Sequence, residues 1–141
     1  MICTFIGNRE LYGDIRARLQ ETLIELITSH NAHTFYVGNH GAFDRCVALT
    51  LKQLKSRFPH INYYVVLAYY PTDEYLVKEH PTMLADGVEE ILPRFRIIHR
   101  NKWMIAQADT VICYVQDITG KARDFAEYAQ RRGKKVIHLY P

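Results

Sequence analysis

Short apolar runs and helical repeats alternate along the first half of the chain. An apolar run over residues 1–6 ends at Gly7 and predicts a strand, and apolar positions at helical spacing over 15–27 predict a helix after it. The pattern then repeats, with a β-rich stretch over 34–37 and an amphipathic helix over 43–54. The two repeats indicate two consecutive β–α units.

The second half of the chain contains a buried strand, an irregular segment and a return to regular structure. Residues 63–68 form an uninterrupted apolar run, which is typical of a strand covered on both faces of a parallel sheet. Over 69–93 prolines interrupt the periodicity, so we expect a long loop or lid with at most one short helix near 83–90. Regular structure then resumes with a helix over 101–108, a strand over 110–115, a helix over 121–131 and a strand over 135–139.

The alternation of strands and helices defines the expected fold class. It predicts a single α/β domain over 1–141, a Rossmann-like three-layer sandwich with a five-stranded, mostly parallel sheet. The expected strand order is 3-2-1-4-5, in which the chain reverses direction between strands one and four. Ligands of such sheets bind at the carboxyl ends of the strands that flank this reversal. We therefore expect the functional residues in the turns after strands one, two and four.

Composition and charge agree with one globular domain and favour an anionic ligand. Hydrophobic residues make up 48% of the chain and charged residues 23%, as in ordinary globular proteins. The formal net charge of +3 attracts anions but falls short of what a dedicated nucleic-acid-binding protein usually carries. The charge therefore points only to anionic ligands in general.

Cysteine and histidine usage bears on location and metal binding. Cys3, Cys46 and Cys113 are widely spaced and indicate core residues in a reducing compartment, not a disulfide frame or a zinc site. The histidines show no metal-ligand spacing, so we expect neither a metal nor a cofactor. The chain also shows no secretory leader pattern and no run long enough to cross a bilayer. These features predict a cytoplasmic protein without a membrane partner.

Three turns carry a glycine beside the amino end of a predicted helix. There, unpaired backbone N–H groups and the positive end of the helix dipole suit an anion, and glycine lets the backbone approach it closely. Taken singly, each glycine could serve only to permit a tight turn. Together the turns predict a phosphate-binding loop built from Gly7, Asn8 and Arg9, from Gly38, Asn39, His40, Gly41 and Asp44, and from Thr119, Gly120 and Lys121.

Two of these residues have alternative roles, and two common motifs are missing. Asp44 could cap backbone N–H groups or accept a ribose hydroxyl, and Arg9 could contact phosphate or remain a solvated surface arginine. The G-x-G-x-x-G fingerprint and the P-loop pattern are both absent, which disfavours a standard dinucleotide-dependent dehydrogenase and an NTPase.

Three segments resemble the SLOG superfamily, which groups the DprA/Smf proteins with the LOG phosphoribohydrolases. They read CTFIGNRE, FYVGNHGAFDRCV and RNKWMIAQADTVICYVQDITGKARDFAEYAQRRGKKVIHL. Within the superfamily they look most similar to the small proteins of the YpsA/DUF1273 type. The resemblance implies a Rossmann-like domain that binds a nucleotide or a nucleotide-derived signal, such as an ADP-ribose-like or NAD-related molecule. Thr119 stands where members of the superfamily often carry a second glycine.

The carboxyl-terminal segment is also similar to nucleoside deoxyribosyltransferases, and this similarity implies Glu127 as a catalytic candidate. A carboxylate near the anomeric carbon can act as a nucleophile or stabilise an oxocarbenium-like transition state. Arg123 lies four residues before Glu127, however, and the two could instead form an exposed helix pair of small energetic value.

Three functional hypotheses follow. The main one is a non-enzymatic sensor or sequestering module for a nucleotide-derived small molecule. The second is an N-glycosidic hydrolase or transferase. The third is DprA-like binding of single-stranded nucleic acid through the basic runs at 94–102 and 131–135, with Tyr69 and Tyr70 able to stack on bases. A homodimer formed through helix faces is a further expectation.

Overall fold

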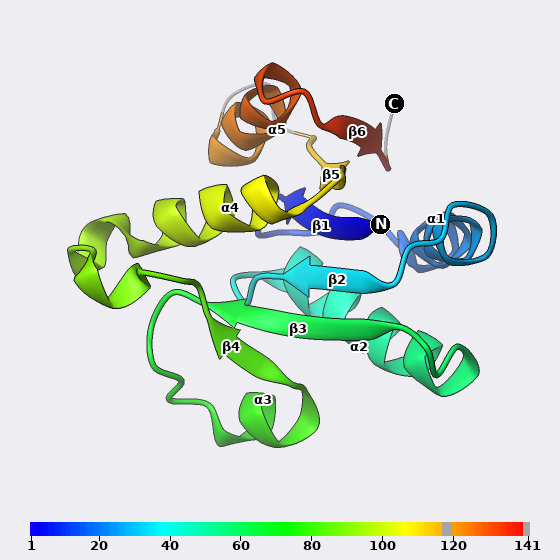
Figure 1. Ribbon diagram of the computed structural model, residues 1–141, viewed down its shortest axis with the longest axis horizontal. Helices are drawn as coiled ribbons and strands as arrows, with labels where there is room; N and C mark the ends of the chain where they lie inside the picture. The colour runs from blue at the N-terminus through cyan, green and yellow to red at the C-terminus, as the bar shows by residue number, and fades with distance from the viewer. Residues whose placement is uncertain (117–119, 140–141) are drawn as a thin grey trace.

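The computed structural model describes residues 1–116 and 120–139, which form a three-layer α/β sandwich (Figure 1). The central sheet of the described residues is parallel throughout, with the order β4-β3-β2-β1-β5-β6. Its strands are β1 (Ile2–Gly7), β2 (Thr34–Val37), β3 (Asn62–Leu67), β4 (Thr82–Leu84), β5 (Thr110–Tyr114) and β6 (Lys135–His138).

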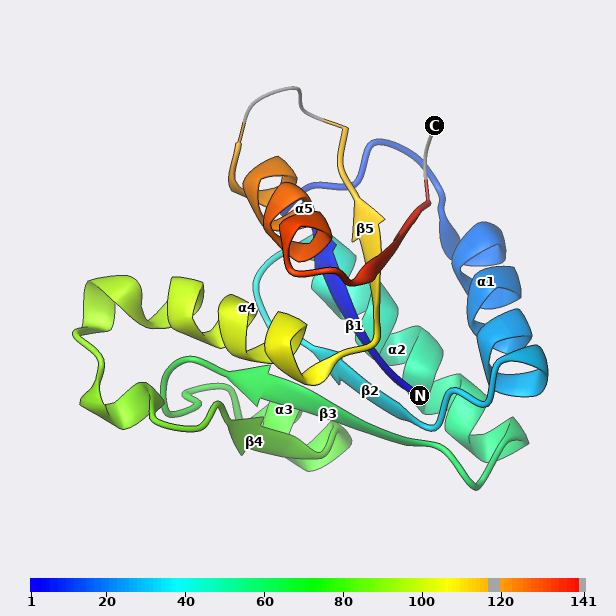
Figure 2. The same cartoon turned by 45° about the horizontal axis from the view of Figure 1, so that its top comes forward.

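Helices cover both faces of the sheet, with α1 and α2 on one side and α4 and α5 on the other (Figure 2). The described helices are α1 (Arg16–Ser29), α2 (Ala42–Arg57), α3 (Glu74–Glu79), α4 (Arg96–Gln107) and α5 (Lys121–Arg131). Two short 3-10 helices, Val88–Glu90 and Pro93–Phe95, lead into α4. None of the described helices is both long and apolar enough to cross a membrane.

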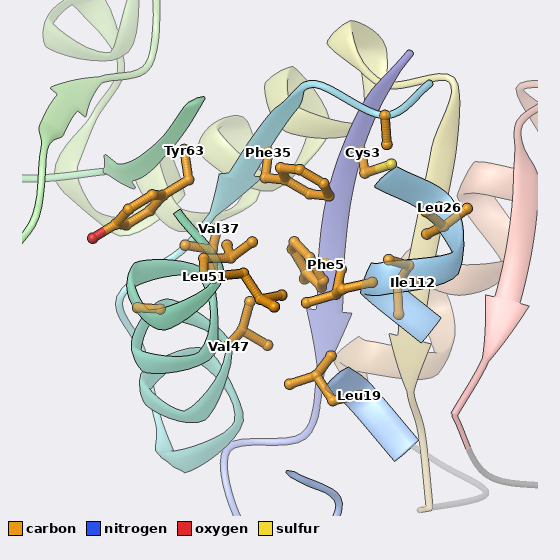
Figure 3. Close-up of a cluster of buried hydrophobic side chains, with 14 of the residues drawn as sticks. Cys3, Phe5, Leu19, Leu26, Phe35, Val37, Val47, Leu51, Tyr63 and Ile112 are labelled. Carbon is orange, nitrogen blue, oxygen red and sulfur yellow. The ribbon is translucent and has the colours of Figure 1, made fainter. Parts of the chain in front are cut away.

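Each face of the sheet has its own hydrophobic core. In the core on the α1 and α2 side, Val47 and Leu51 of α2 pack toward Phe5 and Val37 of the sheet (Figure 3). On the opposite side, α4 and α5 supply the apolar side chains of a second cluster. Because both faces are covered, all five residues of β5 are buried.

The structure confirms the predicted fold class and the relative order of the five expected strands, but the sheet of the described residues has six strands instead of five. The central pair, β1 and β5, is in register from Cys3 opposite Thr110 to Gly7 opposite Tyr114. After β1 the chain passes to one face of the sheet, and after β5 it passes to the other. The expected reversal point is therefore present, and the carboxyl ends of β1, β2 and β5 lie at the same edge.

The segment expected as a long loop with one short helix near 83–90 is more regular than predicted. It contains α3 and the edge strand β4, which places Thr82–Leu84 in the sheet. The backbone bonds from Val65 N–H to Pro81 O and from Ala85 N–H to Leu67 O hold β4 against β3. Three residues are too few to show a strand period, so only the free edge of β3 makes this segment a strand. Helix α4 also begins earlier than expected, at Arg96 instead of residue 101.

Candidate functional site

A pocket of about 580 Å³ opens where β1 and β5 end. Its walls come from the turn after β1, the turn after β2, the inner side of α4 and the start of α5. Four cationic side chains line it, namely Arg9, Arg94, Arg100 and Lys121, against two acidic ones, Glu10 and Asp44. Four positive charges less two negative charges leave an excess of two, so the pocket favours an anion.

The buried guanidinium of Arg100 organises the wall formed by α4. The Arg100 residue is only 2% exposed. Its Nη1 donates to Asn39 Oδ1 at 2.9 Å and to Val66 O at 3.3 Å, and its Nε donates to Asn101 Oδ1 at 3.0 Å. A buried charge is tolerated only when it is hydrogen-bonded and electrostatically compensated. These bonds therefore fix the second turn, the end of β3 and α4 in one arrangement.

His40 belongs to the same cluster and is kept neutral by its surroundings. Its Nδ1 lies 3.2 Å from Arg100 Nη1, and because arginine can only donate, Nδ1 accepts. Burial, together with the positive charges of Arg100 and Arg9, lowers the pKa of His40 to about 4. An anion entering the pocket would meet a neutral imidazole beside a charged guanidinium.

Gly38 allows a carboxylate to approach this guanidinium. A Cβ at position 38 would lie 2.9 Å from Asp44 Oδ2 and 3.0 Å from Arg100 Cζ, so no side chain fits there. Asp44 Oδ2 accepts the backbone N–H of His40 at 3.0 Å. Of the two roles considered for Asp44, the structure shows the backbone contact. Burial raises the pKa of Asp44 to about 6, although Arg100 acts in the opposite direction.

The glycines of the first two turns contact protein atoms. A Cβ at Gly7 would lie 2.3 Å from the ring of Phe43, and a Cβ at Gly41 would lie 2.6 Å from the Cα of Arg9. The N–H of Ala42 donates to Arg9 O at 2.6 Å. These two glycines therefore let the first and second turns pack together. We expected these glycines to let the backbone approach an anion closely. The contacts show instead that they let the two turns pack against each other.

The first turn is tied to β5, while its arginine stays accessible. Asn8 Oδ1 accepts the N–H of Gln116 at 2.8 Å, and the Asn8 N–H donates to Tyr114 O at 3.0 Å. Asn8 is thus a structural link between the two central strands, whereas the exposed Arg9 lines the pocket. Tyr12 follows on the same loop, and its backbone N–H donates to the hydroxyl of Tyr114 at 2.9 Å.

At the third turn, Gly120 and Lys121 line the pocket, and Thr119 lies outside the described residues. Gly120 is the N-cap of α5, with φ of +129°, and no atom of the described residues lies within 4 Å of the Cβ it lacks. Open space in front of a helix N-terminus is the arrangement that suits an anion.

The carboxylates of Glu127 and Asp109 lie away from this pocket. Glu127 is about half exposed and pairs with Arg123 at 3.1 Å, and it is not among the residues that line the pocket. The catalytic role implied for Glu127 gains no support from this placement. Asp109 accepts the N–H of Ile2 at the amino ends of the strands, at the opposite edge of the sheet.

Sequence reasoning missed several residues that the structure brings into the pocket, among them Glu10, Tyr12 and Asn101. It named Arg94 and Arg100 only as members of the basic run at 94–102 and did not place them in this pocket. For Arg100 a signal existed. It precedes Met104 by four residues and Ile105 by five, so it shares the buried side of α4. An arginine that lies at helical spacing from core residues is buried and needs buried partners. This spacing distinguishes Arg100 from the other basic residues of the run at 94–102.

The unusual pKa of Asp44 predicts a specific dependence of stability on pH. The pKa of Asp44 in the folded chain, about 6, lies above its ordinary value of 3.8, so the folded chain binds this proton more tightly than the unfolded chain does. The contribution of this carboxyl to the free energy of unfolding is fully present below pH 4 and is lost as the pH rises to about 6. The loss is on the order of 3 kcal/mol. In Asp44→Asn, whose amide oxygen can still accept the His40 N–H, this loss should disappear. Urea unfolding of both proteins across this range measures the difference, and parallel pH profiles would contradict the assignment.

Fold and pocket together define the class: a Rossmann-like α/β protein with a basic pocket at the point where the strand order reverses. The described residues contain no group of three His, Cys, Asp or Glu side chains placed to hold a metal ion.

Comparison with solved structures shows similarity to DNA processing protein A (DprA). The DprA of Streptococcus pneumoniae aligns with a TM-score of 0.70 at 15% identity, over 96% of this chain and 49% of that chain. The DprA of Helicobacter pylori, a protein with a unique single-stranded DNA binding mode, aligns with a TM-score of 0.63 at 18% identity. This alignment covers 98% of this chain and 64% of the H. pylori chain. The chain thus spans about half to two thirds of the length of these proteins. No family model and no curated protein matches the sequence.

At such low identity the comparison establishes the fold. The Rossmann-like fold shared with DprA agrees with the one that the SLOG resemblance implied. The particular similarity to YpsA/DUF1273-type proteins stays a prediction.

Proposed function

We propose that this chain binds single-stranded nucleic acid and holds a backbone phosphate in the basic pocket. The observation that carries the proposal is the buried, hydrogen-bonded Arg100 with Arg9, Arg94 and Lys121 around the same recess. Phosphate contacts of this kind provide most of the affinity of proteins for nucleic acids. The structural similarity to the H. pylori protein, which binds single-stranded DNA, supports the proposal. This was the least favoured of the three hypotheses from the sequence.

A single strand suits the site better than a duplex. The cations surround a recess, and a flexible strand can turn one phosphate into a recess, whereas a stiff duplex presents its phosphates along a regular helical surface. The net charge of +3 is also too low to cover a long stretch of duplex.

A free nucleotide or nucleotide-derived molecule is the second candidate. The pocket volume of about 580 Å³ lies in the range of sites for small molecules. Asp44 lines the pocket and carries a carboxylate suited to a ribose hydroxyl. Among the described residues no contact favours the N-glycosidic reaction considered from the sequence, since Glu127 lies outside the pocket lining.

Alanine variants of the accessible cations test the proposal. Arg9→Ala and Lys121→Ala should each weaken binding of a fluorescent oligothymidylate and reduce the slope of log affinity against log salt by about one, because each removes one phosphate contact. Fluorescence anisotropy over a salt series measures both effects. Lys135→Ala is the matched control, because this exposed lysine begins β6 at the opposite edge of the sheet.

Two outcomes would reject the proposal. In one, Lys135→Ala weakens binding while the pocket variants do not, which would place the strand on the basic run at 131–135. In the other, the protein fails to bind oligothymidylate but is stabilised against heat by ADP-ribose or AMP, and that result would establish the second candidate.

A further inference from the structure

A group of exposed aromatic side chains lies next to the basic pocket. We call Tyr69, Tyr70 and Phe95 the aromatic shelf. Tyr70 is 66% exposed and Phe95 46%, and the neighbouring Leu92 is 59% exposed. Apolar surface gathered on two segments in this way marks an interaction site more often than scattered exposed residues do.

The aromatic shelf is held in place by hydrogen bonds between the end of β3 and the segment that leads into α4. The hydroxyl of Tyr69 donates to Pro93 O at 2.6 Å. The carboxylate of Glu89, on the same segment, raises the pKa of the Tyr70 hydroxyl. Arg96 Nε donates to Ile91 O at 2.8 Å and closes the turn. The segment that carries the aromatic shelf is therefore positioned before any partner arrives, which lowers the entropic cost of binding.

Arg94 joins the aromatic shelf to the pocket. It lines the pocket, and its Cζ lies 4.8 Å from the centroid of the Phe95 ring. In Figure 1 the segment before α4 lies on the side toward which the carboxyl ends of the strands point. The aromatic shelf and the pocket are thus neighbouring parts of one surface.

We propose that the aromatic shelf stacks the bases of a single strand whose phosphate occupies the pocket. This inference rests on the proposed function and adds the path that the strand takes, from the pocket past Arg94 to Phe95 and Tyr70. Aromatic faces bind bases of any sequence, because every base has a π-face. Near the aromatic shelf, Arg94 and Arg96 are offset by Glu89 and Glu90. This balance of charges suits contact with bases, while phosphates are drawn to the pocket.

The test compares two probes of equal length that share the phosphates but not the bases: an oligothymidylate and an abasic oligodeoxyribose phosphate. Phe95→Ala and Tyr70→Ala should each weaken oligothymidylate binding by about tenfold. Both should bind the abasic probe as the wild type does. Tyr75→Ala is the matched control, because Tyr75 is 64% exposed on α3 and lies outside the aromatic shelf. Tyr69 is left intact, since its hydroxyl supports the turn.

The outcomes separate this inference from the proposed function. If Phe95→Ala and Tyr70→Ala bind oligothymidylate like the wild type, the aromatic shelf is not a base platform, although the pocket proposal stands. If they weaken both probes equally, the aromatic shelf acts on phosphates or on the fold, and the inference is overturned. If they abolish self-association seen by sedimentation and leave both affinities unchanged, the aromatic shelf is a contact between copies of the chain. If the wild type binds neither probe, both proposals fail together.

Discussion

Replacement of Arg100 by alanine is expected to weaken oligonucleotide binding by about a hundredfold and to lower the free energy of unfolding by about 3 kcal/mol. The variant loses the bonds from the guanidinium to Asn39, Asn101 and Val66. It also leaves the carboxylate of Asp44 partly buried without its nearby positive charge. Removal of one member of a buried charged cluster costs more than the cluster contributes as a whole. Anisotropy with oligothymidylate and urea unfolding measure the two effects.

Two further variants separate binding from folding. Arg100→Lys keeps the charge but cannot donate at the several positions that the guanidinium reaches, so we expect it to recover part of the stability and little of the affinity. The double variant Arg100→Ala with Asp44→Asn should recover stability, because no unpaired carboxylate remains, and should not recover binding. If the double variant binds like the wild type, Arg100 is a structural residue alone and the pocket does not depend on its charge.

Replacement of Gly41 by alanine is the second change with a large expected effect. Its φ of +98° lies in a region that side chains disfavour, and the new Cβ would approach the Cα of Arg9 to 2.6 Å and its carbonyl oxygen to 2.7 Å. These atoms belong to the backbone of the first turn and cannot rotate away. We therefore expect the free energy of unfolding to fall by about 3 kcal/mol, from conformational strain and overpacking together. Because the clash displaces Arg9, oligonucleotide affinity should fall as well.

Gly133→Ala is the control for this prediction. Gly133 also has a positive φ, +76°, but no atom in the described part of the chain lies within 4 Å of the Cβ it lacks. Alanine there should cost about 1 kcal/mol from strain alone and leave binding unchanged. Equal destabilisation by the two substitutions would show that the contact between the first two turns contributes nothing.

The fold could be predicted from the sequence because its determinants are local and repeated. The apolar run over 1–6 and the helical spacing over 15–27 each specify an element within one stretch of chain. Short right-handed connections then leave few possible orders for the strands, and the predicted order appears in the sheet. The exception, β4, is too short to carry a period and depends on the edge that β3 offers.

The candidate site could be predicted only in outline. The reversal point and the three turns follow from the topology, so Arg9 and Lys121 were found. The partners of a side chain do not follow from topology. Arg100 meets Asn39 across 61 positions of sequence, and Arg94 reaches the pocket from the basic run that follows the segment expected as a loop. The same limitation made Glu127 look catalytic, although it lies in an exposed ion pair.

The sequence by itself determined the alternation of strands and helices, the order of five strands and the edge of the sheet at which the pocket lies. Only the tertiary structure decided that Arg100 is the buried centre of the site and that Gly7 and Gly41 serve contacts between turns. The physical reason is the distance along the chain over which each kind of information acts. Hydrophobic periodicity acts over a few residues and is visible in any window of the chain. The cost of burying a charge or a methyl group depends on atoms brought together from distant segments, and these meet only in the folded chain.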